Sequence, residues 1–61
     1  MPTIQIDMIE GRTMEQKRAM VKKVTEAVVE SIACPPEAVN IIVRENPKAL
    51  LAQAGKLLSD K

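Results

Sequence analysis

Hydrophobic and polar residues alternate along the first segment of the chain. The apolar positions are Ile4, Ile6 and Met8, and the polar positions before or between them are Thr3, Gln5 and Asp7. A period of two over residues 3–8 predicts a half-buried β-strand. Ile9 breaks this alternation, and Glu10-Gly11 indicates a turn that ends the strand.

The next segment has the spacing of an amphipathic helix. Its apolar residues recur at intervals of three and four: Met20, Val21, Val24, Ala27, Val28 and Ile32. Thr13 and Gln16 form a capping-box pattern, which is typical of the start of a helix. Pro35-Pro36 ends the helix, because proline cannot continue it. The sequence therefore predicts a helix over residues 14–33.

A second alternating segment follows at residues 39–44. Its two faces are Val39, Ile41 and Val43 on one side, and Asn40, Ile42 and Arg44 on the other. A strand, a helix of about 20 residues and a second strand form a β-α-β unit, in which a right-handed crossover joins parallel strands. We therefore expect an α+β fold with a parallel two-stranded sheet and one long helix. Such a narrow sheet has long edges that need partners.

The C-terminal segment, residues 48–61, is compatible with three structures. Asn46-Pro47 predicts a turn before it. Two leucine pairs, Leu50-Leu51 and Leu57-Leu58, then flank Gly55. A helical turn, a short hairpin and an arm lying on a neighbouring subunit all fit this pattern.

Composition indicates a single small domain that is completed by self-association. The chain has 61 residues, 46% of them hydrophobic and none aromatic. A domain of this size usually needs disulfides, a metal or oligomerisation.

Cys34 is the only cysteine and there is no histidine, so an intrachain disulfide is impossible and a zinc site is disfavoured. We interpret Cys34 as a small apolar plug, since no histidine is present to activate it as a nucleophile.

Charge argues against nucleic acid and membranes as partners. The net charge is +1, with both signs spread along the chain and no aromatic stacking platform. No apolar run approaches the roughly 18 residues of a membrane span. Asp7 and Glu10 interrupt the start of the chain, so we expect no signal peptide. We therefore expect a cytoplasmic protein.

Pro2 has two interpretations. It can simply begin a strand, where proline costs no ladder hydrogen bond. Alternatively Met1 is removed, as is general before a small second residue, and Pro2 carries a free secondary amine. An α-amino group has a pKa of about 7.7–8.0, which a desolvated site or nearby positive charge lowers. Such an amine can act as a general base near neutral pH without histidine.

Several motifs together resemble the 4-oxalocrotonate tautomerase family. They are Pro2, the strand at 3–8, Glu10-Gly11-Arg12-Thr13, Glu15-Gln16-Lys17 and Val24-Thr25-Glu26-Ala27-Val28. The resemblance covers residues 2 to about 45 well and the rest weakly. It implies a β-α-β subunit that pairs into dimers and assembles as a homohexamer, a trimer of dimers. It also implies cofactor-free proton transfer in 2-hydroxydienoate or keto-enol carboxylic acids.

The same resemblance implies roles for four residues. Pro2 is the general base and acid after loss of Met1. Arg12 binds the substrate carboxylate, for which a guanidinium fork is suited; without the resemblance, Arg12 would be read as part of a surface ion pair. Asn40 stands where the family has a second arginine, so enolate stabilisation should be weaker. Leu51 replaces a phenylalanine that forms the apolar wall of the pocket.

A second hypothesis comes from a different functional class. The chain is then a non-catalytic oligomerisation module, or one subunit of a hetero-oligomer whose partner supplies the missing arginine. Arg44 lies on the same strand face as Asn40, about 13 Å away at roughly 3.3 Å per residue. It is therefore too distant to replace that arginine within one subunit, although Arg44 of a neighbouring subunit remains a candidate.

Overall fold

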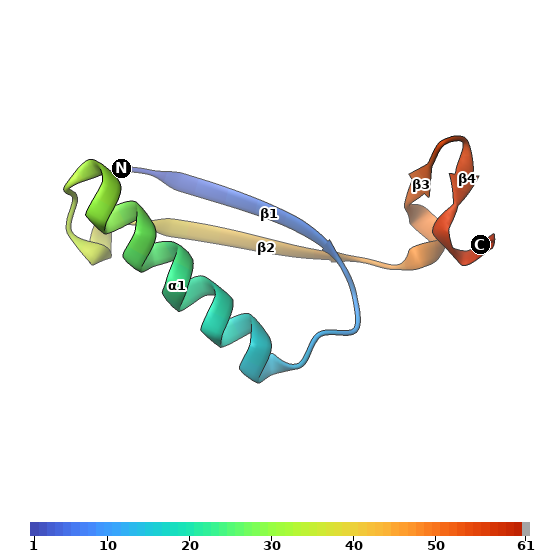
Figure 1. Ribbon diagram of the computed structural model, residues 1–61, viewed down its shortest axis with the longest axis horizontal. Coiled ribbons are helices and arrows are strands. Elements are labelled where there is room, and N and C mark those ends of the chain that lie inside the picture. Colours follow the sequence, from blue (N-terminus) through green and yellow to red (C-terminus); the bar gives the residue numbers. More distant parts are fainter. Residues whose placement is uncertain (61) are drawn as a thin grey trace.

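The computed structural model describes residues 1–60 and consists of one β-α-β unit followed by a small hairpin (Figure 1). Strand β1 (Thr3–Ile9) and strand β2 (Asn40–Asn46) are parallel, with pairs running from Thr3–Asn40 to Ile9–Asn46. Helix α1 (Met14–Ile32) connects them and lies along one face of the two-stranded sheet. The predicted fold class is therefore confirmed.

The strands follow the predicted alternation but differ slightly in their ends. Positions 4, 6, 8, 41 and 43 are half-buried, and the residues between them are exposed. β1 continues through Ile9, because Ile9 still pairs with Asn46. β2 begins one residue later than predicted and ends two residues later. Val39 lies outside β2 because its amide hydrogen-bonds to Pro36 at 3.1 Å, closing the short 3₁₀ helix η1 (Pro36–Ala38).

Helix α1 begins with the predicted capping box. The Thr13 amide donates to Gln16 Oε1 at 2.9 Å, and the Gln16 amide donates to Thr13 Oγ1 at 3.1 Å. These two bonds satisfy amides that the first helical turn leaves without partners. The helix ends at Ile32, one residue before the predicted end, because Ala33 adopts the left-handed conformation with φ 55°.

The C-terminal segment combines two of the three structures left open by the sequence. A 3₁₀ turn, η2 (Lys48–Leu50), precedes strands β3 (Ala52–Gln53) and β4 (Lys56–Leu57), and a second turn, η3 (Leu58–Asp60), follows them. The hairpin loop is Ala54-Gly55, with φ 56° and 82°. Two positive φ values are typical of a type I′ turn. The hairpin lies beyond the end of the sheet, far from the N-terminus (Figure 1).

The chain does not enclose a core of its own. Among the described residues 1–60, no hydrophobic side chain is fully buried. The large apolar side chains that remain exposed are Met1, Met14, Ile32, Ile42, Leu50 and Leu57. The molecule is also flat, measuring 43 × 24 × 14 Å. Exposed apolar surface of this extent on so small a chain is typical of a surface that other chains cover. The structure therefore supports the expectation of oligomerisation.

Candidate functional site

Pro2 and Asn40 lie together at the start of the parallel sheet. The backbone amide of Asn40 donates a hydrogen bond to the backbone carbonyl of Pro2 at 3.0 Å. This bond lies immediately before the Thr3–Asn40 pair of the sheet. Met1 precedes Pro2 in this chain, so the Pro2 nitrogen is an amide here. Met1 is 88% exposed, so its removal would cost almost no packing.

Pro2 lines an apolar hollow of about 410 Å³ between β1 and the C-terminal half of α1. The residues around it are Pro2, Ile4, Val24, Ala27, Val28, Ser31 and Ile32. None of them is charged, and Ser31 supplies the one polar side chain. Pro2 therefore has apolar and uncharged surroundings on this side of the sheet.

Arg12 lies at the opposite end of β1. It follows Gly11, whose φ of 122° is in the region that favours glycine. The strand from Thr3 to Ile9 extends about 20 Å at roughly 3.3 Å per residue. Pro2 and Arg12 of one chain therefore belong to different hollows, and one small substrate cannot touch both.

Leu51 is half-buried at the base of the hairpin. Its carbonyl accepts a hydrogen bond from the Leu58 amide at 2.8 Å, which holds the two ends of the hairpin together. The hairpin is at the same end of the sheet as Arg12 and away from Pro2 (Figure 1). Of the four predicted site residues, one chain thus brings together Pro2 and Asn40 only.

Arg44 is occupied within its own chain. It pairs with Asp7 across the two strands, with Nε to Oδ1 at 2.9 Å and a guanidinium NH₂ to Oδ2 at 3.2 Å. The same NH₂ donates to Gln5 Oε1 at 3.0 Å. The hydrogen bond from Arg44 lowers the pKa of Asp7, and the same bond raises the pKa of Arg44. These bonds disfavour Arg44 as the substitute for the arginine missing at position 40.

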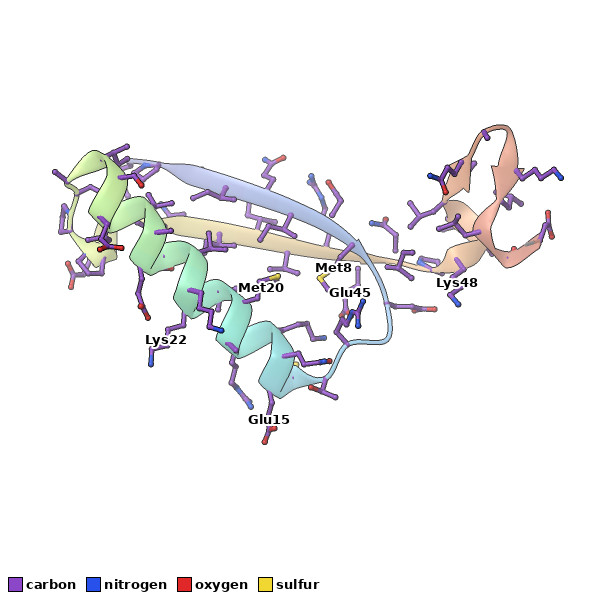
Figure 2. The ribbon with its side chains drawn as sticks, in the orientation of Figure 1. Met8, Glu15, Met20, Lys22, Glu45 and Lys48 are labelled. Carbon is purple, nitrogen blue, oxygen red and sulfur yellow. The ribbon has the colours of Figure 1, made fainter. Side chains whose placement is uncertain are left out.

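The structure also shows contacts of polar residues that have no role in the sequence-based hypothesis. Lys17 Nζ donates to Glu45 Oε1 at 2.9 Å, which joins the first turns of α1 to the C-terminal end of β2. Lys48 lines the same hollow as Arg12. Figure 2 shows Met8 and Glu45 near the end of the sheet, and Lys48 further along, beside the hairpin. The only sequence signal for Lys48 was its place after the Asn46-Pro47 turn.

Within residues 1–60, no three His, Cys, Asp or Glu side chains are grouped so that they would hold a metal ion. Over the same residues, no helix has the length and apolar character needed to cross a membrane. Cys34 is a free, half-buried thiol.

Comparison with known proteins identifies the family. The Tautomerase family, described as "Tautomerase enzyme", matches residues 2–61. The 2-hydroxymuconate tautomerase of Bacillus subtilis is 48% identical over 60 residues, covering 98% of this chain and 97% of that protein. The crystal structure of YwhB, a homologue of 4-oxalocrotonate tautomerase, superimposes with a TM-score of 0.95 at 47% identity, covering 98% of both chains.

One of the similar structures with a lower sequence identity is a hetero-oligomer. The heterohexameric 4-oxalocrotonate tautomerase from Chloroflexus aurantiacus J-10-fl has a TM-score of 0.94 at 27% identity, covering 98% of this chain and 97% of that one. The family match extends over nearly the whole chain, and its fold agrees with that of these structures. This chain therefore belongs to the Tautomerase family and is a tautomerase-type isomerase.

Proposed function

We propose that the protein moves a proton between carbons of 2-hydroxydienoate or keto-enol carboxylic acids, with Pro2 as general base and then acid after Met1 is removed. Arg12 binds the substrate carboxylate, and Asn40 and Leu51 shape the rest of the pocket. The observation that carries this proposal is the uncharged apolar hollow of about 410 Å³ around Pro2. It favours a neutral secondary amine, which can accept a proton near neutral pH.

The exposure of Met1 supports the first step. Met1 is 88% exposed, so its removal takes away little packing at the start of β1. The Pro2 carbonyl stays bonded to the Asn40 amide, so the new amine is held at a fixed position beside the sheet. General acid–base catalysis requires a group placed within hydrogen-bonding distance of the proton it moves, and a fixed position of the amine favours such an arrangement.

The separation of Pro2 from Arg12 supports a site shared between chains. The two residues lie at opposite ends of a strand of about 20 Å, whereas a six-carbon acid is much shorter. Arg12 and Leu51 of a second chain would therefore complete the hollow around Pro2 of the first. The exposed apolar side chains of the single chain favour the same homo-oligomer, which we propose to be a hexamer built as a trimer of dimers.

Asn40 would act on the substrate oxygen where the family uses an arginine. Its side-chain amide makes only a long 3.5 Å hydrogen bond to the Ala38 carbonyl, so little holds it in place. An amide donates a hydrogen bond without a charge and stabilises a developing enolate less than a guanidinium does. We therefore expect slower turnover of dienoates than in relatives that have both arginines.

The test compares Met1-processed protein with the Pro2→Ala variant, whose terminus is a primary amine. Intact mass establishes the processed N-terminus, and absorbance follows conversion of the dienol to the enone. We expect the variant to lose on the order of 10²-fold in kcat/KM, the size of a typical general-base contribution. Equal rates would remove Pro2 from the mechanism.

A second candidate function is favoured by Asn40 and by the heterohexameric relative. In that case the chain is one subunit of a hetero-oligomer, and a partner chain supplies the cation absent at position 40. Retention of Met1 in protein purified from its source, together with inactivity of the pure homo-oligomer, would favour this function over the first.

A further inference from the structure

Two connecting segments leave the end of the parallel sheet side by side. Ile9 pairs with Asn46 as the last rung of the ladder, and the Glu10 amide then donates to the Asn46 carbonyl at 3.0 Å. The Asn46 side chain also donates to the Met8 carbonyl at 3.4 Å. The segment that leads into α1 and the segment that leads into the hairpin are therefore fixed against each other where they begin.

Each of these segments carries a cation two residues beyond the hydrogen bond. Arg12 is two residues after Glu10, and Lys48 is two residues after Asn46. Lys48 begins η2, which is closed by a 2.9 Å hydrogen bond from the Leu50 amide to the Pro47 carbonyl. Both cations line one hollow of about 420 Å³, whose full lining is Met8, Ile9, Glu10, Gly11, Arg12 and Lys48.

The charges of this hollow favour an anionic ligand. Its lining holds two cations and one carboxylate, that of Glu10. Within residues 1–60, the ion pairs join Lys17 to Glu45 and Arg44 to Asp7, and neither Arg12 nor Lys48 takes part in one. Gly11 contributes no side chain, and a Cβ built there would meet no atom within 4 Å. The two cations are thus open to a ligand that enters this space.

We propose that Lys48 is a second cationic ligand of the carboxylate that Arg12 binds, and that it sets a preference for substrates with a carboxylate remote from the reacting end. The inference rests on the proposed function and deepens it. The arginine fork fixes the orientation of the carboxylate with two hydrogen bonds, and the lysine adds a mobile point charge. The hollow around Pro2 has no charged side chain, so recognition of charge is concentrated at the Arg12–Lys48 end.

The kinetic test compares two substrates that differ in one carboxylate. 2-Hydroxymuconate has a carboxylate at each end, and 2-hydroxypenta-2,4-dienoate lacks the remote one. We expect Lys48→Gln to raise KM for the first roughly three- to tenfold, the range between an exposed ion pair and a charge-assisted hydrogen bond. We expect kcat for both substrates, and KM for the second, to stay unchanged.

Two variants serve as matched controls. Lys48→Arg keeps the charge and should retain the low KM. Lys56→Gln removes the same charge from β4, outside the hollow, and should leave both substrates unaffected. Circular dichroism and light scattering verify that each variant has the wild-type fold and assembly. A KM for 2-hydroxymuconate that is the same in Lys48→Gln and wild type would overturn the inference.

A binding measurement separates this inference from the proposed function. Calorimetry with adipate, a saturated six-carbon dicarboxylate, needs no turnover. Weaker binding to Lys48→Gln than to Lys56→Gln supports the inference even if the wild type proves catalytically inactive, which would overturn only the function. Equal binding to the two variants, or no binding to any protein, would overturn the role of Lys48.

Discussion

Arg44 holds Asp7 across the two parallel strands through two hydrogen bonds, of 2.9 and 3.2 Å. The two residues are direct partners in the register, and both are exposed, whereas their neighbours Ile6, Met8 and Val43 are half-buried. Both side chains are about half exposed, at 51% and 57%. Their pairing occupies an arginine that the sequence left as a candidate for the active site.

This pairing predicts a change of stability with pH. The pKa of Asp7 is lowered in the folded chain, so its contribution is fully present above its unfolded pKa of about 3.9 and is lost as pH falls through the lower folded value. Denaturation of wild type, Asp7→Asn, Arg44→Gln and the double variant should give a coupling that is present at pH 7 and absent in strong acid. Because both groups are exposed, we expect that coupling to be small. A coupling that persists unchanged at low pH would contradict the assignment.

The hairpin turn predicts a stabilising substitution. Ala54 has φ 56°, a left-handed conformation that costs a residue with a Cβ roughly 1 kcal/mol. Ala54→Gly should therefore raise the free energy of unfolding by about 1 kcal/mol, as measured with urea. Ala52→Gly, in the extended strand β3, is the matched control and should lower stability instead. Destabilisation by both variants would show that the turn is not type I′.

The asparagine at position 40 predicts that an arginine substituted there raises the activity. Asn40→Arg restores the arginine that the family has at this position, at the start of β2, and should raise kcat/KM for 2-hydroxymuconate on the order of tenfold. Asn40→Gln moves the amide without adding charge and should give no such gain. Steady-state kinetics on processed protein compares the two. A rate for Asn40→Arg at or below wild type would argue that a partner chain already supplies the charge.

The exposed apolar surface predicts that assembly and folding are linked. Ile42 is 44% exposed, whereas Ile41 and Val43 on either side of it in β2 are half-buried. Ile42→Ser should therefore reduce the mass measured by light scattering at low concentration, and the wild-type Tm should rise with protein concentration. Lys22→Ser is the control, because Lys22 points away from the sheet in Figure 2. A folded wild-type monomer whose Tm is independent of concentration would contradict the proposed oligomer.

Local patterns determined the elements of this protein. The alternation of Ile4 and Ile6 with polar neighbours placed β1, and Thr13 with Gln16 placed the start of α1, because both depend on interactions within a few residues. The ends of β1 and α1 depended on more than these local patterns. Ile9 continues β1 only because Asn46 lies opposite, and Ala33 ends α1 by its own backbone conformation, which nothing in the sequence pattern indicated.

The site depended on tertiary structure. The sequence placed Pro2 and Arg12 ten residues apart, and the resemblance gave them one substrate, but an extended strand separates them by its whole length within one chain. Parallel pairing decided that the backbones of Asn40 and Pro2 are hydrogen-bonded, that Asp7 pairs with Arg44, and that Lys48 lines the same hollow as Arg12. Register is a relation between segments that are far apart in sequence, so no pattern local to either strand contains it.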